Sequence, residues 1–412
     1  MFQDHRKSYR PSWLDAAAIG LLLTATLKIM ANATISPALP DLEASFSGVP
    51  NAVYLTRFLV AAPSLTVILV APVAGLLADR IGKGGLLVGG VVLFVLAGSA
   101  GAFLPDLQSI LISRFVLGAA VALTMTAQVA LVGDFYDGPM RSAFLGWQTV
   151  AINFSGLIFI SLAGILAGMS PRLPFLVYLL PALLLPFLVK IRRQEQKTGR
   201  PEADTPQADT ASARQPWLGA ALAVCGLTMT TVMLFFLMPS QIPFYLLESG
   251  IDAASGTAVT LGVLMVCGGT TAMLFKRLSD MAGLPAVFAI GFATMTAGFA
   301  VIVSQPGWLP ILSGAALIGA GYSLVQPGFF VLALKIAPGN RRGSVSGLVT
   351  TAMFAGQVVS PLVLTAWLQE HGFRAVFWGA ALVFAAFAAG SVAAAIAHAP
   401  GNRRPDRIRQ DG

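Results

Sequence analysis

A lysine inside an apolar stretch is the first residue in this sequence that suggests chemistry. Lys28 lies about 15 residues after Trp13, in a run long enough to cross a bilayer. Ionisable side chains are costly in hydrocarbon, so they usually face a partner or a water-filled cavity. Thr24 and Asn32 lie one helical turn before and after Lys28, which predicts a polar stripe on one helix face. The alternative is that Lys28 extends its ammonium to the membrane surface or has a packing role.

Amide side chains in other apolar stretches are candidates for the same cavity. An amide within a membrane span either binds a solute or forms hydrogen bonds between helices. The candidates are Gln128, Gln148, Asn153, Gln326 and Gln357.

Carboxylates are missing from these stretches, because every aspartate and glutamate lies near the end of an apolar run or outside it. A cavity that contains Lys28 and no acid should attract anionic or zwitterionic solutes, since charges interact strongly where the dielectric constant is low. A lysine in a poorly hydrated site can also release its proton, so Lys28 is a candidate for coupling transport to protons.

The composition indicates a membrane protein. The 412 residues are 56% hydrophobic and 11% charged, whereas about a quarter of the residues are charged in soluble domains. The net charge of +8 comes from basic residues scattered between apolar runs, which argues against nucleic-acid binding. Cys225 and Cys267 lie in apolar runs and predict neither a disulfide nor a metal site. The residues around Lys83 lack the spacing of a phosphate-binding loop, and we expect no cofactor.

Twelve apolar runs predict an all-α membrane protein with twelve transmembrane helices in two six-helix halves. The expected halves are residues 1–190 and 217–400, joined by a flexible linker at 191–216 and followed by a polar tail at 401–412. The predicted helices are 13–37, 53–77, 85–104, 109–132, 143–168, 173–190, 217–240, 254–275, 284–304, 308–334, 344–368 and 374–397.

Basic residues gather on one side of the predicted membrane. Loops on that side contain 21 of the 26 lysines and arginines, so the linker and both termini should be cytoplasmic. We expect Arg57 to lie at the outer interface. Arg172 and Arg374, which are 202 residues apart, precede the last helix of each half and suggest an internal repeat.

The turn between the second and third predicted helices contains Gly75, Leu77, Asp79, Arg80, Gly82 and Lys83. It resembles the signature loop of the major facilitator superfamily, with Gly84 in place of a second basic residue. Any tight helical hairpin also favours glycine and charge, which is the simpler interpretation. The resemblance extends to the family's fourth-helix Arg-(x)3-Gly pattern at Arg114 and Gly118, which favours Arg114 as a cavity residue. The segments 36–42 and 242–248 look like the drug:proton antiporter group, although the fifth-helix signature of that group is not kept.

The resemblance implies a gate at this loop. In similar transporters the loop aspartate braces the two halves, and the following arginine pairs with an acid at the end of the fourth helix. Asp134 occupies that place here. We therefore expect Asp79, Arg80 and Asp134 to form a gating cluster, supported by Gly75, Gly82 and Lys83. The alternative is that Asp134 only caps or solvates a helix end.

These observations predict a secondary transporter with the major facilitator fold and alternating access. The expected activity is proton-coupled efflux of a small amphipathic anion or zwitterion, and the alternative is uptake of an organic anion or metal-chelating metabolite. An enzyme or receptor would need a catalytic constellation or a soluble domain, for which 191–216 is too short. A channel would not need the gating loop. We expect a monomer in a bacterial inner membrane.

Overall fold

The computed structural model describes residues 16–136, 138–198, 217–305, 307–338 and 341–397, and this described part contains helices and no strands. Ten helical segments are long and apolar enough to cross a membrane, and the bent pair 52–58 and 62–78 adds another. Helix α15 (Arg342–Ala397) has 56 residues and breaks at Gly372, where φ is 74°. Because one crossing needs about 20 residues, α15 supplies two crossings. The described residues therefore account for twelve crossings.

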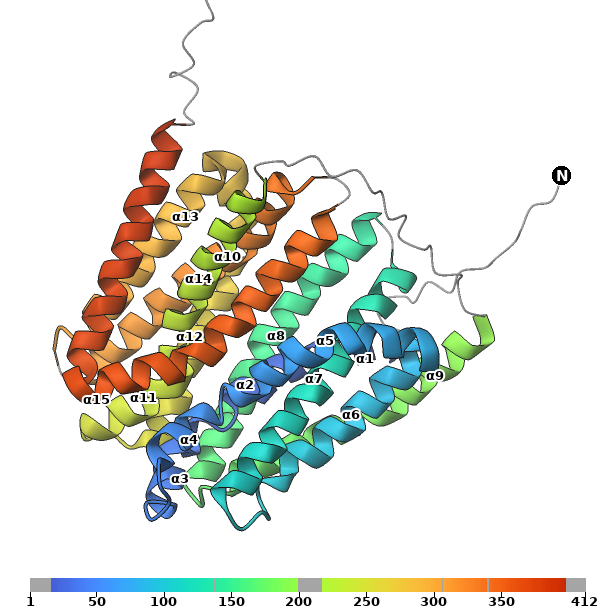
Figure 1. The fold of residues 1–412 in the computed structure, drawn as a ribbon, viewed down its shortest axis with the longest axis horizontal. Helices are drawn as coiled ribbons and strands as arrows, with labels where there is room; N and C mark the ends of the chain where they lie inside the picture. The colour runs from blue at the N-terminus through green and yellow to red at the C-terminus, as the bar shows by residue number, and fades with distance from the viewer. Residues whose placement is uncertain (1–15, 137, 199–216, 306, 339–340, 398–412) are drawn as a thin grey trace, which may run out of the picture.

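The first six crossings form the N-terminal half, coloured blue to green in Figure 1. Pro37 and Pro40 follow the break in the first crossing, where proline removes backbone donors. The elements are α1 (Ala16–Ala25), α2 (Leu27–Ala33), η1 (Ser36–Ala38), α3 (Leu39–Ser45), α4 (Ala52–Phe58), α5 (Ala62–Ile81), α6 (Lys83–Ala100), α7 (Leu107–Phe135), α8 (Gly138–Ala167), η2 (Leu173–Leu184) and α9 (Leu185–Thr198).

The other six crossings form the C-terminal half, which lies beside the first half in Figure 1. The two halves pack together through α5 against α15 and α8 against α12. The elements are α10 (Trp217–Phe235), α11 (Leu237–Glu248), α12 (Ala253–Ala272), α13 (Phe275–Ile302), α14 (Trp308–Ile336) and α15.

Helix α9 ends eight residues later than the sequence predicts, at Thr198, so helix extends into the stretch expected to be a linker. Ile191 is fully buried, and its Cδ1 atom packs against Gly20 of α1. The residues that follow are mostly Arg, Gln, Glu and Lys, which favour helix even outside the membrane. The apolar run marks where the membrane crossing stops, but not where the helix stops.

The two halves repeat each other at a spacing of 201 residues. Gly82 and Gly283 both have positive φ, at 88° and 79°, and each turns the chain into the third crossing of its half. Glycine adopts this conformation without the steric cost that other residues have. Three glycine pairs share the spacing: Gly82 with Gly283, Gly90 with Gly291, and Gly118 with Gly319.

The bundle has a linker end and a far end. The linker end contains the end of α9, the start of α10 and the loop at Gly82. The far end contains α3, α4 and the turn after α11 at Gly250. Figure 1 shows the linker end toward the upper right and the far end at the lower left.

Candidate transport cavity

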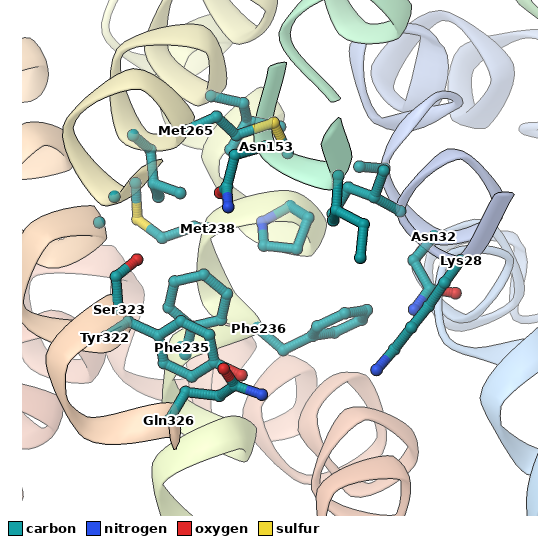
Figure 2. Close-up of a pocket in the computed structure, with 18 of the residues that line it drawn as sticks. Lys28, Asn32, Asn153, Phe235, Phe236, Met238, Met265, Tyr322, Ser323 and Gln326 are labelled. Carbon is teal, nitrogen blue, oxygen red and sulfur yellow. The ribbon is translucent and has the colours of Figure 1, made fainter. Parts of the chain in front are cut away.

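A cavity of about 290 Å³ lies between the two halves. The N-terminal half contributes residues of α2 and α8 to its wall, and the C-terminal half contributes residues of α12, α14, α15 and the α10–α11 junction. Figure 2 shows Lys28 reaching in from one side, with Tyr322, Ser323 and Gln326 on the other. Residues from both halves therefore meet around one space.

Lys28 provides the positive charge of this cavity. Its Nζ atom lies 5.3 Å from the centroid of the Phe354 ring, a cation–π contact. Lys28 makes no hydrogen bond or ion pair with any other residue that the structure describes, and none of the residues around the cavity is acidic. Any positive charge on the described wall of the cavity therefore comes from Lys28. Asn32 shares the cavity, whereas Thr24 donates to the carbonyl of Gly20 within its own helix.

The opposite wall combines aromatic and polar side chains on α14. Tyr322, Ser323 and Gln326 share one helix face, because residues three and four apart lie above one another. The Tyr322 ring stacks on Phe235, with ring centroids 3.7 Å apart and planes 11° apart. A solute in the cavity thus meets an apolar surface and hydrogen-bonding groups together.

Gln357 of α15 ties the N-terminal half to the C-terminal half at the cavity. Its Oε1 atom accepts hydrogen bonds from Asn32 Nδ2 at 2.9 Å and from Ser64 Oγ. Asn32 and Ser64 belong to α2 and α5, so one amide joins three helices. Two predicted cavity residues, Asn32 and Gln357, therefore contact each other directly.

Further hydrogen bonds between the halves continue from the cavity to the far end. Arg57 donates to Gln241 at 2.9 Å, and Tyr54 donates to Gln369 at 2.7 Å. Gln357 and Gln369 are 12 residues apart on α15, or about 18 Å along the helix. The hydrogen bonds therefore span the side of the cavity that faces the far end. We call this set the far-end seam: Asn32, Tyr54, Arg57 and Ser64 of the N-terminal half with Gln241, Gln357 and Gln369 of the C-terminal half.

Arg57 is the charged member of the far-end seam and is only 7% exposed, rather than at an interface with water as the sequence suggests. Its guanidinium lies 4.1 Å from the centroid of the Phe244 ring, and its Nε atom lies 3.6 Å from Glu43. Gln241 in turn donates to Thr365 at 3.0 Å. Arg57 is buried because the two halves close over it, which a single apolar run cannot reveal.

Replacing Arg57 by methionine should favour opening at the far end. The variant loses a charged hydrogen bond between the halves, so we expect the open fraction to rise about 5- to 30-fold. Spin labels on the exposed residues Ser45 and Glu248 would report this as a longer distance population. Arg374→Met removes an exposed arginine and serves as the control. An unchanged distance distribution in Arg57→Met would contradict the assignment.

Three predicted cavity residues lie elsewhere in the N-terminal half. Gln128 and Gln148 are absent from the cavity wall, and Gln128 Nε2 donates to Gln148 Oε1 at 3.1 Å between α7 and α8. Arg114 is fully buried and donates to the carbonyl of Gly98 at 2.7 Å. The sequence cannot distinguish such pairing from a cavity position, because both place a polar side chain inside an apolar run.

Arg114 packs between aromatic rings rather than against the cavity. Its guanidinium carbon lies 4.9 Å from the ring centroid of Phe175 and 4.8 Å from that of Tyr178. The Tyr178 hydroxyl donates to the carbonyl of Met30 at 3.1 Å, where α2 is about to end. Arg114 therefore connects α6 with η2, and Tyr178 connects η2 with α2.

The loop at Gly82 places Lys83 next to Asp134, the acid predicted for the gating cluster. Lys83 Nζ lies 2.6 Å from Asp134 Oδ2 and 2.8 Å from Asp134 Oδ1. This ion pair joins the start of α6 to the end of α7. Arg80 is exposed at the end of α5, and the side chain of Asp79 lies outside the described part. Asp134 thus pairs within the N-terminal half, and the gating role of Asp79, Arg80 and Asp134 stays a prediction. Gly75 lies on α5, with open space around it.

The sequence does not distinguish the aromatic and sulfur-containing residues of the cavity from core or lipid-facing residues. Phe235, Phe236, Met265 and Tyr322 look like ordinary core residues in an apolar run. For Tyr322 the sequence does contain a signal, because Tyr322 and Ser323 precede the predicted cavity residue Gln326 by about one helical turn on α14. The described residues contain no group of His, Cys, Asp or Glu that could hold a metal ion.

Two helical halves around one central cavity, with many membrane crossings, define a multi-pass membrane transporter. The sequence profile of the Major Facilitator Superfamily matches residues 21–361, with a second match at 256–411. The chain therefore belongs to the Major Facilitator Superfamily, and it is a transporter rather than an enzyme.

Curated relatives include exporters of drugs. Multidrug resistance protein 1 of Bacillus subtilis (strain 168) is 23% identical over 312 residues, covering 74% of this chain and 78% of that protein. Quinolone resistance protein NorA of Staphylococcus aureus is 22% identical over 323 residues, covering 76% and 80%.

Solved structures share the fold. A D-xylose–proton symporter has a TM-score of 0.73 with 19% identity, covering 94% of this chain and 97% of that one. The peptide transporter POT in complex with sulfate has a TM-score of 0.73 with 14% identity, covering 95% and 97%.

Proposed function

We propose that this chain exports a small amphipathic anion or zwitterion in exchange for protons. Lys28 carries the proposal, because it places a basic side chain in a cavity whose described lining residues include no acid. A cation would be repelled from this site, whereas an anion gains a charge-assisted contact. The sulfur and aromatic side chains around Lys28 suit an apolar body on the same solute.

The relatives support efflux. Their printed names describe multidrug and quinolone resistance, so export of small organic compounds is the activity that this likeness favours. An aromatic compound with a carboxylate is consistent with the printed names of these relatives, and its negative charge fits Lys28. Protons are proposed as the coupling ion, with Lys28 as a candidate carrier.

We propose that the linker end faces the cytoplasm of a bacterial cell, with both termini on that side of the inner membrane and the protein acting as a monomer. Basic residues favour the cytoplasmic side. With the far-end seam closed, the cavity would then exchange solute with the cytoplasm. Described basic residues near the linker end are Arg80, Lys83, Lys190, Arg192, Arg193, Lys276, Arg277, Lys335 and Arg341.

Alternating access would follow from rocking of the two halves around this cavity. Opening at the far end requires the far-end seam to separate, including the bonds from Asn32 and Ser64 to Gln357. Asn32 and Gln357 also line the cavity, so a bound solute lies beside the bonds that hold the far end closed. The proposed solute site and the proposed gate at the far end are therefore adjacent.

Transport by purified protein in proteoliposomes tests this function. With an imposed pH gradient, we expect proton-driven movement of 2-naphthoate and of a zwitterionic quinolone. The oppositely charged 2-naphthylmethylammonium, which has a similar ring and size, should not move. Transport of the cation alone would overturn the proposed substrate class, and transport of anions without any response to the pH gradient would overturn proton coupling.

A further inference from the structure

The wall of the cavity opposite Lys28 has hydrogen-bonding groups that have no partner among the residues described by the structure. The Tyr322 hydroxyl, the Ser323 hydroxyl and the Gln326 amide form no hydrogen bond with any other residue that the structure describes. Polar groups inside proteins are nearly always hydrogen-bonded to protein or water, and these three side chains are partly exposed to the cavity, where a solute can reach them. Three such groups on one face of α14 therefore point to a ligand, and Figure 2 shows them along one side of the cavity.

The packing behind these residues keeps them facing the cavity. Stacking on Phe235 fixes the ring of Tyr322, so its hydroxyl direction is set by the ring plane. Ser323 lies against Gly268 of α12, where an added Cβ atom would come within 2.7 Å of the Ser323 Oγ atom. A side chain at Gly268 would displace the hydroxyl, so the glycine keeps room for it.

The charge and these groups belong to different halves. Lys28 lies on α2 in the N-terminal half, and Tyr322, Ser323 and Gln326 lie on α14 in the C-terminal half. In Figure 2 the aromatic rings of Phe235, Phe236 and Tyr322 lie between Lys28 and Ser323. A ligand that satisfies both walls must be charged at one end, apolar and flat in the middle, and polar at the other end.

We propose that Tyr322, Ser323 and Gln326 form a second subsite, which binds an uncharged hydrogen-bonding group at the end of an aromatic acid distant from its carboxylate. This inference rests on the proposed function, since the carboxylate is assigned to Lys28. Hydroxyl and amide side chains both donate and accept, so a hydroxyl or a carbonyl on the ligand fits the subsite. The substrate class is then an aromatic carboxylate with a polar group on its far edge.

Such a ligand bridges the two halves. Its carboxylate contacts α2 and its distal group contacts α14, so both contacts form together only when the halves are close to the relative position seen here. Rocking of the halves would break one of them. The subsite thereby links recognition of the distal group to the conformation of the transporter.

Two probes that differ by one hydroxyl test the subsite. 2-Naphthoate and 6-hydroxy-2-naphthoate share the ring and the carboxylate, and only the second carries a distal polar group. Calorimetric titration of detergent-purified protein should give about 3- to 10-fold tighter binding of the hydroxylated probe, the effect of one added hydrogen bond. Tyr322→Phe combined with Gln326→Leu should remove this preference, so that the affinities of the two naphthoates for the variant differ by less than twofold. Ser313→Ala, a serine elsewhere on α14, is the matched control.

The outcomes separate this inference from the proposed function. If wild type binds both naphthoates equally, or the double variant keeps the preference, the second subsite is wrong and the anion site stands. If neither naphthoate binds and 2-naphthylmethylammonium does, the proposed function fails and the subsite fails with it. Should the double variant not fold, Tyr322→Phe alone carries the test, because it removes one oxygen atom and keeps the stacked ring.

Discussion

Replacing Gly118 or Gly319 by alanine should destabilise the protein strongly, because the added methyl group would meet the backbone of a neighbouring helix. A Cβ atom on Gly118 would lie 2.2 Å from the carbonyl oxygen of Pro63, and one on Gly319 would lie 2.1 Å from that of Leu264. Both obstacles are backbone atoms, so no side chain can rotate away. The helices must separate instead, and overpacking of this kind costs about 1–3 kcal/mol or more.

Gly118 and Gly319 are related by the internal repeat, and so are the residues they contact. Pro63 and Leu264 are also 201 residues apart. Each glycine lets the fourth crossing of its half lie against the second: α7 on α5, and α14 on α12. We therefore expect similar effects from the two substitutions, and near-additive effects in the double variant because the sites lie in separate halves.

Thermal unfolding of purified protein, followed by size-exclusion chromatography with fluorescence detection, measures this effect. Gly89→Ala is the matched control, since nothing lies within 4 Å of the added atom and alanine favours helix. The control should melt at or above the wild-type temperature, whereas both test variants melt lower. Equal melting of Gly118→Ala and wild type would show that the helices are not held in backbone contact.

Replacing Lys28 by methionine should abolish preferential transport of anions. The substitution keeps the length and apolar stem of the side chain and removes its charge. A charge-assisted contact in a cavity contributes about 1.5–3 kcal/mol, so we expect anion binding to weaken about 10- to 100-fold. Lys28→Arg keeps the charge and should retain much of the activity. Proteoliposome uptake of 2-naphthoate measures both variants.

Two controls distinguish loss of charge from loss of structure. Lys335→Met removes an exposed lysine from the end of α14 and should leave uptake unchanged. Lys28→Met should also melt near the wild-type temperature, because Lys28 has no ion pair with a described residue to lose. If Lys28→Met were folded and took up 2-naphthoate at the wild-type rate, Lys28 would be a structural residue.

Much of the fold follows from the apolar pattern. Twelve runs predict twelve crossings, and the polar stretch after the sixth run separates the halves. The pattern misplaces the end of α9, because the helix continues past the apolar run to Thr198, with Ile191 packed on Gly20. It also misses the backbone contact at Gly118, since a glycine in an apolar run gives no sign of what it touches.

The sequence predicts the candidate site only in part, because it does not show which helix faces meet the cavity. Lys28, Asn32, Asn153, Gln326 and Gln357 line the cavity as expected from polar residues in apolar runs, although their roles stay predictions. Arg114 shares that pattern and instead packs on Phe175 inside the N-terminal half. Periodicity specifies a helix face, but the tertiary arrangement decides whether that face meets a cavity or another helix.

One binding measurement decides whether the cavity selects solutes by charge. The affinities of 2-naphthoate and 2-naphthylmethylammonium, measured by calorimetric titration on the same preparation, give an anion-to-cation ratio. We predict that wild type prefers the anion at least about tenfold, as one buried charge contact provides, and that Lys28→Glu reverses the preference. A wild type that prefers the cation, or a folded Lys28→Glu variant with an unchanged ratio, would contradict the account.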